Sequence, residues 1–416
     1  MKNWAGNYEF RAARVHRPSS VEETQEIVAG VGKARALGTR HSFNAIADSS
    51  EDLISTERLD RIVSIDRDRR TVTVEGGLPY GRLCQTLDAE GFAIPNLASL
   101  PHISVAGAVA TATHGSGERN GNLSTAVSAL EIVTADGGFV RLSREVDGDR
   151  FAGAVVGLGG LGVVVGVTLD LEPAFTMRQW VYEGLSFELA VEHLDEIEAS
   201  GYSVSLFTGW SGPDIDQVWV KRREEAGDPP ATLFGARLAP DHRHPIPGVS
   251  AENCSPQMGV SGPWYARLPH FRMEFTPSNG EELQAEYIVA REHAGAALRE
   301  IDGLRERIAP YLHTSEIRTV AADDLWMSPS YRRDSLCIHF TWKPEWETVR
   351  ALLPVIEERL APFDARPHWG KLFTMPGSRI AGLYPRMDDF RDLLRIYDPE
   401  GKFRNAYLDE TVFDSR

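Results

Sequence analysis

The amino-acid sequence predicts an α+β protein built from two domains. The chain has 416 residues, more than a single hydrophobic core usually supports. Short helical and strand patterns mix up to about Leu171, whereas longer strand patterns separated by loops and helices begin near Phe175. We therefore expect a first domain over residues 1–173, a second, sheet-based domain over residues 174–365, and a C-terminal segment over residues 366–416.

The first domain is expected to begin with a capped helix. Ser20 can cap a helix that starts at Val21, and Glu23 completes a capping box. The next elements in order are strands at residues 33–37 and 71–75, a helix over residues 79–90, and a β-hairpin formed by residues 130–134 and 139–142.

An uncharged stretch of 19 residues, 151–169, contains six glycines. This length is nominally enough for a membrane helix, but so many glycines weaken a helix strongly. We therefore expect a glycine-rich loop followed by a buried strand over residues 163–169.

The same stretch contains a pattern typical of nicotinamide-dinucleotide sites. Gly157, Gly159 and Gly162 satisfy GxGxxG, and Glu183 lies about twenty residues further on, as that pattern requires. The pattern also needs a strand before the glycines and a helix after them. Here a β-branched run follows the glycines, so the order is reversed and we expect no Rossmann site.

Two separated segments, residues 38–44 and 104–117, are the strongest candidates for a cofactor site. Gly, Ala, Ser and Thr fill nearly every position of the second segment. Small residues let the backbone approach a ligand closely, and consecutive exposed N–H groups suit a pyrophosphate. The alternative is a tightly packed turn without a ligand. Together the two segments predict a binding site for a flavin dinucleotide.

His41 brings a reactive side chain to the first of these segments. A neutral imidazole is nucleophilic, and it can attack an electrophilic methyl group on a flavin ring. A histidine in a loop can equally serve as a plain hydrogen-bonding group.

Several strand patterns in the second domain have an apolar face and a polar face. The polar face of such a sheet meets either solvent or a ligand. The polar sets are Glu316 with Arg318, Cys337 with His339 and Thr341, Gln284 with Glu286, and Arg272 with Glu274, on strands expected over residues 316–320, 336–342, 283–288 and 271–275.

Composition argues against several other classes of protein. A net charge of −16 disfavours a nucleic-acid partner, because phosphates would repel such a surface. Cys84, Cys254 and Cys337 have no CxxC spacing, so we expect buried free thiols.

His242 and His244 lack a third nearby ligand, so we expect no metal. The amino terminus lacks an apolar secretory stretch, and we expect a cytoplasmic protein without a membrane anchor.

The chain resembles the alditol oxidases, which include xylitol oxidases and belong to the vanillyl-alcohol oxidase superfamily of flavoproteins. The resemblance runs nearly end to end. The segments that carry it are residues 40–44, 96–117, 316–319, 339–342 and 368–371. It implies a PCMH-type FAD-binding domain, a sheet-based substrate (cap) domain, and a C-terminal segment that returns to the flavin.

The resemblance also implies roles for individual residues. FAD would be attached covalently through His41. The expected flavin contacts are Ala36, Leu37, Gly38, Thr39, Arg40, His41, Ser42, Ser99, Ser104, Gly107, Thr111, Ala112, Thr113, His114, Val163 and His368. The expected polyol-binding residues are Ser99, Gln284, Glu316, Arg318, Thr341 and Lys371, and the expected catalytic residues are Lys371, Arg318 and His339.

The implied reaction is oxidation of the terminal hydroxyl of an alditol, such as xylitol or sorbitol, to the aldose, with reduction of oxygen to hydrogen peroxide. Either Lys371 or His339 would receive the hydroxyl proton. The alternatives are an aldonolactone oxidase or dehydrogenase and a non-catalytic flavin- or sugar-binding protein. We expect a monomer whose partners are a small polyol and molecular oxygen.

Overall fold

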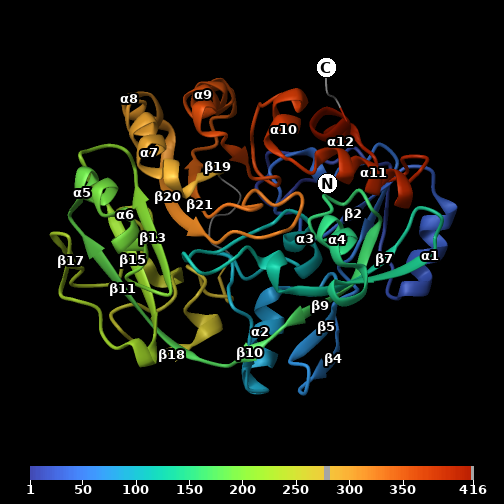
Figure 1. The fold of residues 1–416 in the computed structure, drawn as a ribbon, viewed down its shortest axis with the longest axis horizontal. Helices are drawn as coiled ribbons and strands as arrows, with labels where there is room; N and C mark the ends of the chain where they lie inside the picture. Colours follow the sequence, from blue (N-terminus) through green and yellow to red (C-terminus); the bar gives the residue numbers. More distant parts are fainter. Residues whose placement is uncertain (276–281, 414–416) are drawn as a thin grey trace.

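Three main β-sheets organise residues 1–275 and 282–413, the part of the chain that the computed structural model describes (Figure 1). Two of them lie within the first 173 residues, and the third extends from β11 (Thr176–Glu183) to β22 (Arg366–Pro367). Helices and strands are mixed throughout, as the predicted α+β class requires.

The smallest main sheet has three parallel strands in the order β1–β3–β2. These are β1 (Arg14–His16), β3 (Asp52–Ser55) and β2 (Ala34–Leu37). The chain leaves the end of β2 directly into the segment that contains His41, so this sheet fixes the start of a candidate cofactor loop.

The second sheet is antiparallel. Its strands in spatial order are β4 (Ile62–Asp66), β5 (Thr71–Glu75), β9 (Val163–Asp170), β7 (Val127–Val133) and β8 (Phe139–Ser143). Strands β7 and β8 form the expected hairpin.

The third sheet has ten strands and makes most of the second domain. Its path is β16 (Thr232–Leu233), β17 (Ala236–Leu238), β11, β15 (Gln217–Arg223), β13 (Ser203–Thr208), β20 (Leu312–Val320), β21 (Ser335–Trp342), β19 (Leu283–Ala290) and β22, with β18 (Gly262–Pro263) paired to β11. Two small two-stranded pairs complete the sheets, β6 (Phe92–Ala93) with β10 (Glu172–Pro173) and β12 (Leu185–Ser186) with β14 (Asp214–Ile215).

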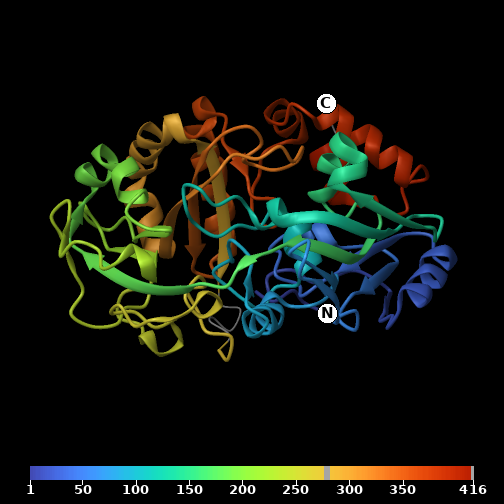
Figure 2. The same cartoon turned by 60° about the horizontal axis from the view of Figure 1, so that its bottom comes forward.

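Helices cover the outer sides of these sheets. Figures 1 and 2 show α5 to α9 along one side of the ten-stranded sheet, and α10 to α12 beside the first two sheets. The helices are α1 (Val21–Gly30), α2 (Tyr80–Ala89), α3 (Val105–Ala110), α4 (Arg144–Val155), α5 (Phe187–Glu192), α6 (Leu194–Glu198), α7 (Ala294–Asp302), α8 (Arg305–Ile308), α9 (Trp346–Arg359), α10 (Gly377–Leu383), α11 (Met387–Tyr397) and α12 (Ala406–Leu408).

Most of the predicted elements are confirmed. Ser20 Oγ accepts a hydrogen bond from the backbone N–H of Glu23 and caps α1, as expected. The Glu23 carboxylate accepts its hydrogen bonds from Ser19 instead of Ser20, so the capping box is displaced by one residue. Cys84, Cys254 and Cys337 are buried free thiols, as the sequence predicts.

Two predicted elements are wrong. Residues 151–155 are the end of α4 and not a loop, because the apolar side chains Phe151, Ala154 and Val155 pack into the main core. The strand expected over residues 271–275 does not form. Phe271 makes only an isolated bridge to Cys254, and Met273 and Glu274 lie in a turn.

The glycine-rich loop itself lies between α4 and β9. A helix therefore precedes the glycines and a strand follows them, the reverse of the order that the nicotinamide-dinucleotide pattern needs. None of the helices in the described ranges is both long and apolar enough to cross a membrane.

Candidate active site

A large cavity lies where the ten-stranded sheet meets the first 173 residues. It encloses about 2020 Å³ of empty space, including its open mouth. Residues of β2, α3 and the loops around them line one side, and residues of β19, β20 and β21 line the other. The cavity thus combines the predicted cofactor segments with the predicted substrate strands.

Most of the residues expected to contact FAD line this cavity. They are Ala36, Leu37, Gly38, Thr39, Arg40, His41, Ser42, Ser99, Ser104, Gly107, Thr111, Thr113, His114 and His368.

Two of the expected flavin contacts lie elsewhere. Ala112 packs into the main hydrophobic core. Val163 packs into a separate cluster with Val28 and Phe403, and Val164 lines the cavity in its place. The reason is that successive side chains of a strand point to opposite faces, so neighbouring residues of β9 cannot both face the cavity.

The surroundings of Ser104 fit a bound dinucleotide. Ser104 Oγ is buried and has no hydrogen-bond partner among the described residues. A Cβ atom at Gly38 would lie 2.7 Å from this oxygen, and one at Gly107 would lie 2.9 Å from it. The two glycines therefore make room for the Ser104 hydroxyl, and a buried hydroxyl without a partner among the described residues suits a polar ligand.

The backbone around His41 fixes the direction of its side chain. Arg40, directly before it, has a left-handed backbone with φ of 63°, and its carbonyl oxygen accepts a hydrogen bond from Trp4 N. The Trp4 ring stacks on the imidazole at a centroid distance of 5.3 Å. Burial and the nearby His102 lower the pKa of His41 to about 4. His41 is therefore neutral, and nucleophilic, at physiological pH.

The three central strands of the large sheet have the alternation that the sequence predicts. Leu336, Ile338, Phe340 and Trp342 of β21 pack into the core, while His339 and Thr341 face the cavity. Cys337, expected on the polar face with them, instead packs with Ile288 and Val320. Cross-strand pairing sets Glu286 of β19 opposite His339, and His339 opposite Glu316 of β20. All the expected polyol-site residues line this wall or its rim: Ser99, Gln284, Glu316, Arg318, His339, Thr341 and Lys371.

The segment that contains Lys371 is attached to both sides of the cavity. The backbone N–H groups of His368 and Leu372 donate to the carbonyl oxygens of Glu286 and Gln284 on β19. On the other side, the Asn44 side-chain amide donates to the Lys371 carbonyl oxygen at 2.8 Å. These contacts bring the chain back to the loop of His41 after the large sheet is complete.

Glu286 is the central anion of the wall, and sequence reasoning did not assign it to the site. Its two carboxylate oxygens accept hydrogen bonds from Arg318 Nη2 and Lys371 Nζ, each at 2.6 Å. Burial raises the pKa of Glu286, but Lys371 and Arg318 outweigh that effect and hold it well below its ordinary value. The signal was present in the sequence, because Glu286 shares a strand face with Gln284.

His339 and Arg318 have unused hydrogen-bonding capacity at the cavity. Neither ring nitrogen of His339 has a hydrogen-bond partner within residues 1–275 and 282–413, and neither does Arg318 Nε. Burial, together with nearby Lys371, holds the pKa of His339 well below its ordinary value, so the ring is neutral. Buried polar atoms without partners are rare, and these belong to two residues that line the cavity.

His114, Glu286 and His368 lie close enough together to hold a metal ion. However, both Glu286 oxygens already accept hydrogen bonds from Arg318 and Lys371. A divalent cation placed there would be repelled by these two charges, so we do not assign a metal to this cluster.

Sequence reasoning also missed Arg35, a buried residue of β2 that lines the cavity. Its guanidinium donates to the carbonyl oxygens of Leu158 and Gly159 in the glycine-rich loop, of Ile46, and of Phe403 near the carboxyl end. It therefore joins three distant segments beneath the cavity. No local pattern marks it, because its partners are backbone atoms.

Two family models match the chain. Residues 12–143 match an FAD-binding domain, and residues 277–411 match D-arabinono-1,4-lactone oxidase. An alditol oxidase from Streptomyces sp. is 49% identical over 98% of this chain and 97% of its own length. An L-gulono-1,4-lactone dehydrogenase from Mycobacterium tuberculosis is 30% identical over 97% of each chain.

Among solved structures, cholesterol oxidase from B. sterolicum has a TM-score of 0.76 and covers 99% of this chain and 96% of its own, at 16% identity. This likeness concerns the fold. With the FAD-binding match, it confirms the predicted two-domain architecture with a PCMH-type FAD-binding domain. Because the relative at 49% identity spans nearly the whole chain, the protein belongs to the alditol oxidase family of vanillyl-alcohol-oxidase-type flavoproteins, and it is an FAD-dependent oxidoreductase that acts on alcohols.

Proposed function

We propose that this enzyme oxidises the terminal hydroxyl of alditols such as xylitol and sorbitol to the aldose and passes the electrons to oxygen, releasing hydrogen peroxide. The supporting observation is the cavity wall formed by Glu286, His339 and Glu316 on three adjacent strands. A polyol offers only hydroxyl groups, so its recognition requires several fixed donors and acceptors. The wall supplies both, together with the unpartnered nitrogens of His339.

We propose that Gln284, Glu316 and Thr341 bind the hydroxyls remote from the reacting carbon. Burial raises the pKa of Glu316, but Arg318 and His270 outweigh it, so the carboxyl is ionised and acts only as an acceptor. Lys371 and Arg318 would lie beside the reacting oxygen and stabilise the negative charge that develops on it.

We propose that His339 receives the hydroxyl proton. Its ring is neutral and both nitrogens lack partners among the described side chains, whereas Lys371 Nζ is engaged by Glu286. A base of low pKa suffices, because the hydroxyl becomes strongly acidic as hydride leaves its carbon. The carbon thus loses a hydride and the oxygen loses a proton, which leaves a carbonyl group.

The segments 36–42 and 104–114 would hold the FAD, and His41 would carry it covalently. When bound, FAD accepts the hydride and transfers the electrons to oxygen. The chain contributes a neutral imidazole at position 41, small residues along the cavity, and the free hydroxyl of Ser104. The buried free thiols accord with a reducing compartment such as the cytoplasm.

A second candidate is oxidation of an aldonolactone. It is favoured by the relative named L-gulono-1,4-lactone dehydrogenase and by the lactone oxidase family model over residues 277–411. Like an alditol, this substrate has several hydroxyls that the wall can bind.

A substrate screen distinguishes these candidates. The purified holoenzyme is incubated with xylitol, sorbitol or L-gulono-1,4-lactone, and peroxide release and dye reduction are measured. We expect peroxide with xylitol and sorbitol, at a kcat/KM at least about tenfold above that for the lactone, a difference of about 1.4 kcal/mol. Preference for the lactone would establish the second candidate, and no turnover with any of them would refute both and point to a different alcohol substrate.

A further inference from the structure

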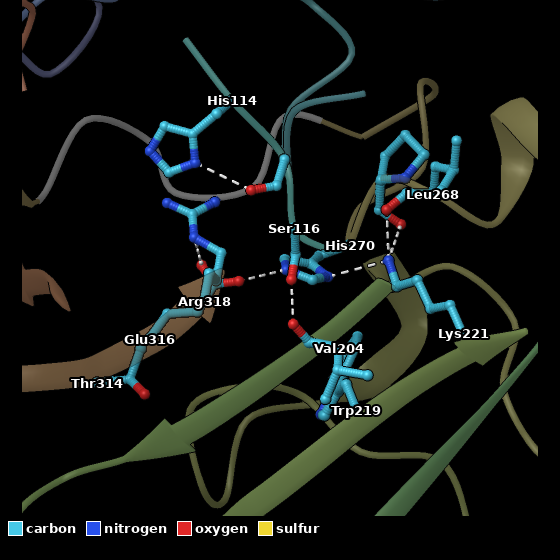
Figure 3. Close-up of polar contacts among 12 residues, drawn as sticks. His114, Ser116, Val204, Trp219, Lys221, Leu268, His270, Thr314, Glu316 and Arg318 are labelled. Atoms are coloured by element: carbon cyan, nitrogen blue, oxygen red, sulfur yellow. Dashed lines mark hydrogen bonds and ion pairs between the residues drawn. The ribbon is translucent and has the colours of Figure 1, made fainter. Parts of the chain in front are cut away.

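Three buried polar side chains, Lys221, His270 and Glu316, form a row of contacts that ends in the cavity wall (Figure 3). Lys221 Nζ on β15 lies 3.2 Å from His270 Nδ1, and His270 Nε2 lies 2.7 Å from Glu316 Oε1 on β20. Lys221 is 1% exposed and the other two are 4% exposed. His270 and Glu316 line the cavity, whereas Lys221 is not among the described residues that line it, so Lys221 would act on a substrate only through the other two.

The donors of Lys221 fix the direction of the hydrogen bonds. Nζ donates to the carbonyl oxygens of Leu268 and Pro269, and its third contact is His270 Nδ1. An ammonium group has three donors and no acceptor, so His270 Nδ1 must accept. The ring proton is then on Nε2, where it is donated to Glu316. Lys221 therefore selects the tautomer of His270 that binds the carboxylate.

Aromatic neighbours hold the His270 ring in this orientation. The rings of Phe207 and Trp219 meet it edge-on, at centroid distances of 5.4 and 5.2 Å. The Trp219 indole is held in turn, because its Nε1 donates to Gln217 Oε1 at 2.7 Å. The imidazole is thus confined by packing as well as by hydrogen bonds.

Glu316 also has a cationic neighbour, Arg318, that competes with His270 for the carboxylate. Arg318 Nε lies 3.6 Å from Glu316 Oε2, an ion pair too long for a hydrogen bond, and Nε has no hydrogen-bond partner among the described residues. Arginine and carboxylate favour close bidentate pairs. The hydrogen bond that His270 donates to Oε1 opposes such pairing, so Oε2 can still accept a hydrogen bond from a ligand.

We infer that Lys221 and His270 are positioning residues for substrate binding: they hold Glu316 away from full pairing with Arg318, so that Glu316 Oε2 accepts a polyol hydroxyl. This inference rests on the proposed polyol site. Neither Lys221 nor His270 takes part in the transfer of hydride or of the hydroxyl proton.

Paired amide substitutions test the role of His270. In His270→Gln the amide nitrogen replaces Nε2 and can still donate to Glu316, whereas in His270→Asn it replaces Nδ1 and falls short. Anaerobic stopped-flow reduction of the holoenzyme by xylitol gives the dissociation constant and the limiting rate separately. We expect His270→Asn to weaken xylitol binding by about tenfold or more, the usual effect of a lost hydrogen bond to a charged group, with a smaller change in the limiting rate. His270→Gln should restore binding to within about threefold of wild type.

Lys221→Met tests the role of Lys221, and a spectroscopic signal reports directly on the tautomer of His270. Burial lowers the pKa of Lys221 to about 7, so the experiments are run at pH 6, where Lys221 is protonated. In ¹⁵N spectra of histidine-labelled protein, the signal that disappears in His270→Gln identifies His270. We expect the Nε2–H tautomer in wild type and a tautomer mixture in Lys221→Met, whose xylitol binding should weaken as in His270→Asn.

The outcomes are distinguishable. Flavin content and thermal midpoint, measured on every variant, report on folding, and the Gln and Asn pair decides the question even if Lys221→Met does not fold. Unchanged xylitol binding in His270→Asn, or equal losses in the Gln and Asn variants, would overturn the positioning role and leave the proposed function intact. Failure of xylitol and sorbitol to reduce the wild-type flavin would instead refute the proposed function, and this inference with it.

Discussion

Lys371 and Glu286 form a buried ion pair, with 2.6 Å between Nζ and Oε2, that joins the C-terminal segment to strand β19. Arg318 occupies the other oxygen of the same carboxylate. One anion therefore fixes two cations at the wall of the cavity, and a cation fixed before the reaction stabilises developing charge without reorganisation. This arrangement places Lys371 where the proposed reaction needs a fixed cation.

Removing the charge of Lys371 should impair turnover more than flavin binding. In Lys371→Met, Glu286 keeps Arg318 as a partner, while the reacting oxygen loses one cation. We expect kcat for xylitol to fall by about 10²–10³-fold, the usual effect of deleting one preorganised charge-stabilising group. Steady-state peroxide release with xylitol, together with the flavin absorbance per chain, measures this. The exposed Lys2→Met is the matched control, and a loss below about threefold would contradict the assigned role.

His41 should determine whether the flavin survives denaturation. In His41→Ala the nucleophilic imidazole is absent, whereas the small residues of the cavity are unchanged, so FAD should bind without a covalent bond. After acid precipitation we expect yellow wild-type protein, and a colourless His41→Ala pellet with flavin in the supernatant. The exposed His293→Ala serves as the control and should stay yellow. A coloured His41→Ala pellet would place the attachment on another residue.

Arg35 should contribute strongly to stability because its guanidinium satisfies carbonyl groups of three segments. Arg35→Met leaves those buried oxygens without their donor. We expect the free energy of unfolding to fall by about 3 kcal/mol or more, since each hydrogen bond to a charged group contributes about 1.5–3 kcal/mol. Urea denaturation followed by tryptophan fluorescence measures the change. The exposed Arg237→Met should alter it by less than about 0.5 kcal/mol, and equal effects would contradict the assignment.

Glu198 should make the enzyme less stable as pH rises. Burial raises the pKa of this α6 carboxyl to about 8, and Thr319 Oγ1 donates to it at 2.9 Å. In the unfolded chain the group loses its proton near its ordinary pKa of about 4.3. Between these two pKa values the folded state binds more protons than the unfolded state. The contribution of Glu198 to the free energy of unfolding is therefore complete below the lower pKa and is lost as pH rises to about 8.

Glu198→Gln removes this titration and keeps an acceptor for Thr319. We expect its free energy of unfolding, relative to wild type, to grow by about 1.4 kcal/mol per pH unit across the window and to level off above it. Urea denaturation at pH 5, 6.5 and 8 checks this, with the exposed Glu196→Gln as control. A constant difference between Glu198→Gln and wild type would show that Glu198 is ionised in the folded protein.

The polar face of the substrate sheet could be predicted from the sequence, because the side-chain alternation of a strand is local. Glu316 with Arg318, and His339 with Thr341, face the cavity as the two-residue period requires. The same two-residue period did not produce a strand at residues 271–275. No strand within residues 1–275 and 282–413 pairs with this segment, and a strand forms only when a partner accepts its hydrogen bonds.

Local chemistry in the sequence thus determined the capped first helix, the small-residue cofactor segments and the alternating strands, since each depends on residues that are close together in the sequence. The tertiary structure alone decided that Lys371 meets Glu286, that His270 reaches Glu316, and that Arg35 binds the glycine-rich loop. These pairs join segments that are far apart in the chain. Their energies depend on burial and on distances between atoms, which exist only after the sheets have assembled.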